Sequence, residues 1–237
     1  MNPRVIVALD YDRREDAEQF VSLVKPEDCL LKVGLQMFTK LGPDFVKSLT
    51  EKGFGVFLDL KFYDIPNTVA GAVRSAASLG VKMLTVHAAG GPLMLKAAVE
   101  AASQFPPEKR PPLLGVTVLT SIDEPQLDTT GVTGSVRDQV LRLATLALGS
   151  GLDGVVCSAM EAADLRRVVG PDFRLVTPGI RPKGTDRGDQ KRIFTPEAAV
   201  QAGSDYLVIG RPITRSDDPA GVLRQINSSI ENLTAAE

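Results

Sequence analysis

The sequence predicts a single (β/α)8 barrel, the TIM-barrel form of the α/β class, over residues 1–237. Eight short apolar segments with strand character alternate along the chain with eight longer segments that have helical periodicity. A length of 237 residues also suits one barrel of this kind. The main alternative is an open doubly wound sheet, which is less favoured because no Gly-x-Gly-x-x-Gly motif follows the first predicted strand.

The predicted strands are runs of four to seven mostly aliphatic residues, as expected for parallel strands that are covered on both faces. In chain order they are Val5–Leu9, Leu30–Val33, Phe54–Leu60, Met83–Val86, Leu113–Leu119, Gly154–Cys157, Arg174–Thr177 and Tyr206–Ile209. None of these runs approaches the ~20 apolar residues that a membrane-spanning helix needs. The chain is therefore not expected to associate with a membrane.

The predicted helices have apolar residues at the spacing of one buried face. Seven of them are Arg14–Val24, Thr68–Leu79, Met94–Ala102, Val136–Leu148, Glu161–Val169, Pro196–Ala202 and Pro219–Ile230. The helix after the second strand contains Gly42 and Pro43, which both disfavour helix. Two pieces are therefore expected there, Met37–Lys40 and Asp44–Glu51. No repeat and no linker divides the chain.

Composition and charge exclude several classes of function. A net charge of -2 gives no overall field that attracts nucleic acid, so an anionic ligand needs a local pocket. The first residues enter a strand-like run at once, so no signal peptide is expected. Cys29 and Cys157 lie far apart in apolar runs and are expected to be reduced core thiols of a cytoplasmic protein. The single histidine, His87, rules out multi-histidine zinc sites and disfavours a Ser-His-Asp triad.

Polar residues gather where the predicted strands end. In a (β/α)8 barrel the active site lies at the carboxyl ends of the strands, so these positions are the candidates for chemistry. In chain order they are Asp10, Lys32, Asp59, Lys61, His87, Thr120, Ser121, Arg181, Gly210 and Arg211. Their convergence on one rim favours a functional site, because charges in a barrel interior are costly without a purpose.

Asp59 and Lys61 are the strongest candidates for a reaction centre. Residues i and i+2 of a strand project from the same face, ~6.6 Å apart along the strand, so a carboxylate and an ammonium are expected side by side. Each candidate also has a structural interpretation. Asp10 stands where a helix cap often does, Lys32 suits a rim with its ammonium in water, and an Asp-x-Lys pair is compatible with a structural ion pair. For His87, packing is favoured over a role as general base.

Two loops have the composition of an anion site. The loops after strands 7 and 8 of such barrels often bind phosphate. Gly210 lets backbone N–H groups approach an anion, and Arg211 is placed as a bidentate donor. The loop from Pro178 to Phe194 is long enough to be a mobile lid. Three basic residues of that loop are expected to be solvated: Arg187, Lys191 and Arg192.

The stretch Asp59-x-Lys61-x-x-Asp64-Ile-Pro-Asn-Thr68 resembles the signature of the orotidine 5'-phosphate decarboxylase family in its bacterial form. Asp-x-Lys-x-x-Asp alone is shared with related phosphosugar enzymes, but seven further segments match in order and extend the resemblance over nearly the whole chain. These segments are Val-Ala-Leu-Asp10, Lys32-Val-Gly, Thr85-Val-His87-Ala, Val118-Leu-Thr120-Ser121, Thr177-Pro-Gly-Ile-Arg181, Gly188-Asp-Gln190 and Ile209-Gly-Arg211-Pro-Ile.

The resemblance implies a carboxy-lyase that converts orotidine 5'-monophosphate to UMP and carbon dioxide, the last step of de novo UMP synthesis. It implies that no metal and no organic cofactor takes part. It also implies a homodimer with shared active sites, in which Asp64 and Thr68 reach the site of the partner subunit.

The resemblance also implies a role for each matching residue. Lys61 is expected to donate a proton to C6 of the pyrimidine, within a charge network that includes Lys32, Asp59 and Asp64. Substrate contacts are expected from Asp10 and Lys32 to the ribose, from Thr120 to the pyrimidine, and to the phosphate from Arg181, Gln190, Gly210 and Arg211.

Two other interpretations stay open at this point. One is a phosphosugar decarboxylase, aldolase or epimerase on the same barrel, for which a divalent metal is expected. The other is a catalytically silent barrel that only binds a phosphorylated metabolite. The Asp59 and Lys61 pair disfavours the second, since a protein that only binds has no need of both charges.

Overall fold

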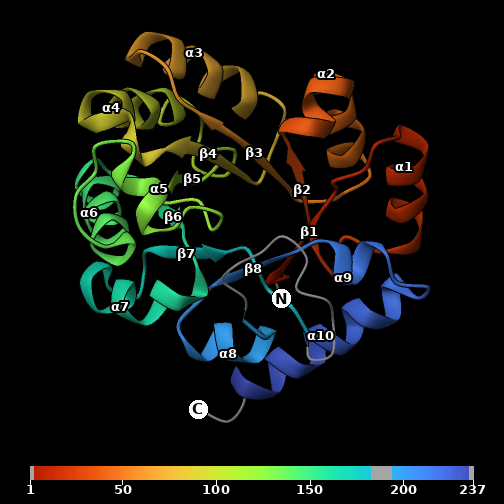
Figure 1. Cartoon of the computed structure of the whole chain (residues 1–237). Coiled ribbons are helices and arrows are strands. Elements are labelled where there is room, and N and C mark those ends of the chain that lie inside the picture. Colours follow the sequence, from red (N-terminus) through yellow and green to blue (C-terminus); the bar gives the residue numbers. More distant parts are fainter. Residues whose placement is uncertain (1–2, 183–193, 235–237) are drawn as a thin grey trace.

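The computed structural model describes residues 3–182 and 194–234, which form a closed barrel of parallel strands with helices around it (Figure 1). Each strand pairs with the next in chain order, and β1 pairs with β8 to close the sheet. The strands are β1 (Val5–Ala8), β2 (Leu30–Gly34), β3 (Val56–Phe62), β4 (Met83–His87), β5 (Leu113–Val116), β6 (Gly154–Val156), β7 (Arg174–Thr177) and β8 (Tyr206–Ile209). The predicted (β/α)8 fold is confirmed.

The helices follow the strands around the outside of the barrel (Figure 1). They are α1 (Arg14–Leu23), α2 (Leu35–Glu51), α3 (Pro66–Ala77), the 3-10 helix η1 (Ala88–Gly90), α4 (Gly91–Ala102), α5 (Glu124–Asp128), α6 (Val136–Gly149), α7 (Ala159–Val169), α8 (Pro196–Gln201), α9 (Arg211–Thr214) and α10 (Pro219–Thr234). The expected break in α2 is present, because Gly42 has a φ of 65° and interrupts the helix.

The end of β5 differs from the prediction. The strand ends at Val116, three residues before the predicted end at Leu119. The neighbouring strands explain this. Val116 pairs with His87 and Val156, which are the last residues of β4 and β6, so neither neighbouring strand extends further. Thr120 consequently lies in the loop after β5 rather than at a strand end.

Two short helices, α5 and α9, were not predicted from the sequence. The first lies in the stretch rich in Ser, Thr, Asp and Gly that follows β5, and it begins with a capping box between Asp123 and Gln126. The second begins at Arg211, directly after β8. Hydrophobic periodicity does not predict helices of four or five residues, because such helices span barely one turn.

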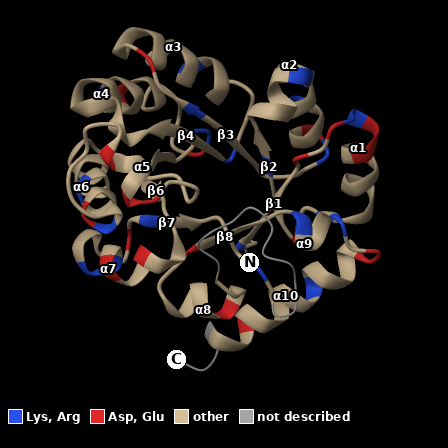
Figure 2. Ribbon diagram, viewed as in Figure 1, with Lys and Arg blue, Asp and Glu red and all other residues tan. Residues whose placement is uncertain are grey.

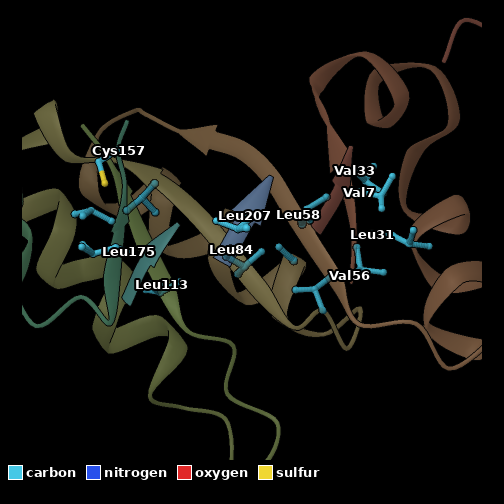
Figure 3. Close-up of a cluster of buried hydrophobic side chains, with 14 of the residues drawn as sticks. Val7, Leu31, Val33, Val56, Leu58, Leu84, Leu113, Cys157, Leu175 and Leu207 are labelled. Carbon is cyan, nitrogen blue, oxygen red and sulfur yellow. The ribbon is translucent and has the colours of Figure 1, made fainter. Parts of the chain in front are cut away.

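The core has two layers because strand side chains alternate between the two faces of the sheet. One layer fills the barrel interior with Ile6, Ala8, Leu30, Phe57, Met83, Leu114, Val176 and Val208. The other lies between the sheet and the helices, and Figure 3 shows part of it, including Val7, Leu31, Val56, Leu58, Leu84, Leu175 and Leu207. Cys29 and Cys157 are both buried as predicted, and burial raises the pKa of the Cys29 thiol to about 12.

Carboxylates hold the amino ends of the strands together. Asp153, just before β6, accepts two hydrogen bonds of 3.0 Å from the Arg110 guanidinium and one of 2.8 Å from the Leu113 N–H. Asp205, just before β8, accepts a bond of 2.7 Å from Arg166 and one of 2.7 Å from a backbone N–H of β7. Charge-assisted bonds of this kind are strong. The charged groups at the amino ends of the strands therefore stabilise the fold, whereas those at the carboxyl ends are the candidates for chemistry.

The outer surface carries both signs of charge. Figure 2 shows basic and acidic residues interspersed over the outer helices, which is what a net charge of -2 from 27 basic and 29 acidic side chains leads one to expect. Across the described ranges, none of the helices combines the length and the apolar character that crossing a membrane requires.

Candidate active site

A cavity of about 790 Å³ opens at the carboxyl ends of the strands. Its floor consists of apolar side chains of the barrel interior, such as Phe57 and Val208. Nine of the predicted candidates line it: Asp10, Lys32, Asp59, Lys61, Thr120, Ser121, Arg181, Gly210 and Arg211. A pocket with an apolar floor and a few convergent charges has the general form of a small-molecule site.

Asp59 and Lys61 form an ion pair inside this cavity, with 2.8 Å between Lys61 Nζ and Asp59 Oδ2. Their side chains are 12% and 28% exposed, so the pair is largely shielded from water. The second carboxylate oxygen, Oδ1, accepts a bond of 3.0 Å from the hydroxyl of Thr85 on β4. Thr85 Oγ1 in turn accepts a bond of 2.9 Å from the Lys61 backbone N–H.

The backbone around this pair is not a regular strand. Leu58 pairs with Leu84 and Phe62 pairs with Val86, so four residue steps of β3 lie opposite only two steps of β4. Among the described residues, Lys61 is the only non-glycine residue with a positive φ, which is 52°. The side-by-side charges were predicted from a regular pleat, and they are present although that pleat is broken.

Lys32 and Asp10 form a second ion pair on the same rim. Lys32 Nζ lies 3.1 Å from Asp10 Oδ1, and the side chains are 12% and 56% exposed, respectively. Gly34 keeps the space beside the ammonium open, because a Cβ at this position would lie 2.9 Å from Lys32 Nζ. This pair places an ammonium and an accessible carboxylate at the cavity wall, where they suit hydroxyl groups of a ligand.

Three arginines line the cavity from the loops after β7 and β8. Arg181 is buried and donates from Nη1 to the carbonyl of Ile180 at 2.9 Å. Arg211 is the first residue of α9, and Arg215 follows the end of that helix. The cavity thus has a strongly basic side, and guanidinium groups are suited to phosphate because they donate in a planar fork.

Two of the predicted site residues, Asp64 and Thr68, are not among the residues that line this cavity. Asp64 and Thr68 are exposed, and Asp64 Oδ1 accepts a bond of 2.6 Å from the Ile65 N–H at the start of α3. Gln190 lies outside the described residues, as do Gly188 and most of the predicted lid.

His87 also lies outside the cavity lining. Its ring stacks on that of Tyr63, with 5.3 Å between centroids, and its Nδ1 accepts a bond of 3.4 Å from the Ala89 N–H. Burial, with a smaller contribution from the charge of Lys61, lowers the pKa of His87 below its usual value. The imidazole is therefore neutral at pH 7, and the arrangement favours the packing role.

Two residues at the site were missed in the sequence. Thr85 could have been noticed in the sequence, since it is a polar residue in the middle of a mostly apolar strand. Nothing in the sequence pointed to Arg215, because it follows a helix of four residues, which is too short to be predicted from hydrophobic periodicity. Within residues 3–182 and 194–234, no three His, Cys, Asp or Glu side chains are grouped so that they could hold a metal ion.

Comparison with known proteins agrees with this geometry. The family model described as "Orotidine 5'-phosphate decarboxylase / HUMPS family" matches residues 3–226. A protein named orotidine 5'-phosphate decarboxylase from Vibrio parahaemolyticus is 56% identical over 230 residues, which are 97% of this chain and 98% of the relative. A protein of the same name from Pseudoalteromonas translucida is 57% identical over 228 residues, which are 96% of this chain and 97% of the relative.

The fold comparison gives the same result. The crystal structure of orotidine 5'-phosphate decarboxylase from Lactobacillus acidophilus superposes with a TM-score of 0.87 at 41% sequence identity. The match covers 97% of this chain and 99% of that structure. With a family model over nearly its whole length, and relatives above half identity over nearly theirs, this chain belongs to the orotidine 5'-phosphate decarboxylase / HUMPS family.

Proposed function

We propose that the protein decarboxylates orotidine 5'-monophosphate to UMP and carbon dioxide, without a metal or an organic cofactor, in the de novo synthesis of UMP. The observation that carries the proposal is the shielded Asp59 and Lys61 ion pair, which faces a cavity whose other side is lined by arginines. The names of the relatives support the same reaction.

In this proposal Lys61 is the acid that protonates C6 of the pyrimidine. Loss of carbon dioxide leaves a carbanion at C6 with little resonance relief, so the barrier is high. A positioned general acid contributes a factor of ~10²–10⁴, or about 3–5 kcal/mol. Lys61 also attracts the negative charge as it develops, before the proton is transferred. The ammonium, 2.8 Å from Asp59 Oδ2, is held at the cavity wall by the carboxylate.

Asp59 adds a second contribution through the substrate carboxylate. Two like charges 4 Å apart repel by about 4 kcal/mol at an effective dielectric constant of 20. This repulsion is relieved as the carboxylate leaves as neutral carbon dioxide. Both oxygens of Asp59 already accept hydrogen bonds, from Lys61 and Thr85, and this fixes the carboxylate in the position from which it repels.

The remaining lining residues are assigned to binding. Asp10 and Lys32 hold the ribose hydroxyls, and Thr120 contacts the pyrimidine. The phosphate is held by Arg181, Gln190, Gly210 and Arg211. Binding energy from the phosphate, which is remote from C6, is available to order the charges around the reacting carbon.

We expect Arg211→Ala to lower kcat/KM for orotidine 5'-monophosphate about 100-fold, because truncation removes a charged partner of the phosphate. The same change is expected to have little effect on the bare nucleoside, which lacks that phosphate. Steady-state kinetics on both substrates measure the difference. Arg224→Ala, on the exposed face of α10, is the matched control and is expected to leave both substrates unaffected. An equal loss on nucleotide and nucleoside contradicts the assignment.

The proposed enzyme is a homodimer in which Asp64 and Thr68 complete the site of the partner subunit. Tyr63 and Ile65, which flank Asp64 in the sequence, are 62% and 67% exposed, and Leu93 in the first turn of α4 is 76% exposed. They lie near the start of α3 and α4, which run side by side on the barrel (Figure 1). Exposed apolar groups gathered in this way are typical of an interaction surface. Asp64, which is exposed and does not line the cavity of its own chain, suits a partner's site.

The experiment that tests the reaction is incubation of the purified protein with orotidine 5'-monophosphate, with and without EDTA. We expect absorbance of the substrate to fall at the same rate in both samples, and UMP to accumulate. Activity that disappears with EDTA favours a metal-dependent phosphosugar type of chemistry on this barrel. Binding of UMP without any consumption of orotidine 5'-monophosphate favours the catalytically silent barrel that only binds a phosphorylated metabolite.

A further inference from the structure

A buried threonine joins the two charged residues of the site through its hydroxyl. We propose that Thr85 is a positioning residue that fixes Asp59 and Lys61 in their reactive arrangement. The inference extends the proposed function, since it concerns how the same pair is held. Thr85 lies on β4, has no exposed surface, and does not line the cavity, so it acts through the other two residues rather than on the substrate.

The direction of each hydrogen bond follows from the chemistry of a hydroxyl, which has one hydrogen to donate. The Lys61 N–H donates to Thr85 Oγ1 at 2.9 Å, so the hydroxyl hydrogen is available for Asp59 Oδ1 at 3.0 Å. The other oxygen, Oδ2, accepts from Lys61 Nζ at 2.8 Å. Thr85 and Asp59 therefore connect the backbone nitrogen of Lys61 to its own side-chain ammonium in a closed ring.

This ring holds Lys61 in a conformation that a residue with a Cβ seldom adopts. Its φ of 52° lies in the left-handed region. The pairing of β3 with β4 is irregular between Leu58 and Phe62, and in this gap the Thr85 side chain accepts the hydrogen bond of the Lys61 N–H. A backbone conformation of this kind persists where its surroundings over-determine it.

Burial makes the hydroxyl difficult to replace. Thr85 is 0% exposed and the Asp59 side chain is only 12% exposed, so little water reaches the carboxylate oxygen to which the hydroxyl donates. A hydrogen bond to a charged group is stronger in such surroundings, and an unsatisfied partner is correspondingly costly. Without the hydroxyl, the Asp59 carboxylate and the Lys61 N–H each lose a hydrogen bond at once.

The test is Thr85→Val, which keeps the shape of the side chain and removes the hydroxyl. We expect kcat to fall about 10- to 100-fold while KM and the affinity for UMP change by less than about twofold, because the misplaced groups act on the reacting carbon. Thr85→Ser, which restores a hydroxyl, is expected to recover most of the lost kcat. If Thr85→Val does not fold, Thr85→Ala provides the same comparison.

Thr117→Val is the matched control. Thr117 is another buried threonine, directly after the end of β5, but its hydroxyl donates to the Val156 carbonyl at 2.9 Å and does not contact the charged pair. It is expected to change stability without a selective loss of kcat. A Thr85→Val enzyme with unchanged kcat overturns the proposal, and so does a kcat loss that Thr85→Ser fails to recover or that Thr117→Val reproduces.

A crystal structure of Thr85→Val gives an answer that does not depend on activity. We expect the Asp59 carboxylate to rotate and the separation of Lys61 Nζ from Asp59 Oδ2 to exceed 2.8 Å. Unchanged geometry overturns the positioning role even if the proposed reaction is wrong. Conversely, a wild-type protein without decarboxylase activity overturns the proposed function, while the structural comparison still decides the role of Thr85.

Discussion

Lys61→Ala is expected to lower kcat by about 10³-fold or more while the affinity for UMP stays close to that of the wild type. The change removes both the proton donor and the charge that stabilises the carbanion, whereas the arginines on the other side of the cavity remain. The Asp59 carboxylate then stays in a shielded place without its ammonium partner. Turnover of orotidine 5'-monophosphate and calorimetric titration with UMP measure the two quantities separately.

The matched control for this variant is Lys25→Ala, since Lys25 is 72% exposed and pairs only loosely with Glu27 at 3.9 Å. It is expected to retain full turnover. Turnover retained in Lys61→Ala contradicts the proton-donor role. A loss of UMP affinity equal to the loss of turnover indicates a damaged cavity instead, and thermal unfolding of both variants identifies that case.

The sequence predicted the barrel and the rim on which the site lies because both depend on local patterns. Alternating apolar runs and helical segments define eight units, and the fold rule then places the strand ends together. Asp10, Lys32, Asp59 and Lys61 were all found in this way, and all four line the cavity. The prediction of these four residues needed only the order of the strand and helix segments, which can be read from the sequence.

The exact geometry of the pair was beyond sequence reasoning because it depends on how two strands meet. The positive φ of Lys61 follows from an irregular register between β3 and β4 and from a hydroxyl on the neighbouring strand. Neither the irregular register nor the position of the hydroxyl can be predicted from the spacing of Asp59 and Lys61 in the sequence. The early end of β5 has the same origin, since it depends on where β4 and β6 end.

Asp64 and Thr68 could not be placed by periodicity either. The structure leaves both of them exposed, in the stretch that also contains the exposed Tyr63 and Ile65, and neither lines the cavity of its own chain. Their position makes sense for the proposed site only if a second subunit covers this surface. The exposed position of these residues agrees with the dimer proposed from the family resemblance, in which both reach the partner's site.

Mixing Lys61→Ala subunits with Asp64→Ala subunits is expected to restore activity that neither variant has alone. In a two-fold dimer with shared sites, the mixed dimer has one site with an intact Lys61 and an intact Asp64 from the partner. Random association gives mixed dimers in half of the molecules, and one of their two sites is intact. Co-expression is therefore expected to yield about a quarter of the wild-type activity per subunit.

The control pairs Lys61→Ala with Asp59→Ala. These two residues lie on the same strand and contact each other within one chain, so every site of the mixed dimer lacks one of them. No recovery is expected in that mixture. Different affinity tags on the two subunits, purified in sequence, establish that mixed dimers form. If mixed dimers of Lys61→Ala and Asp64→Ala form and remain inactive, Asp64 acts within its own subunit, and the surface around Tyr63 and Leu93 has another purpose.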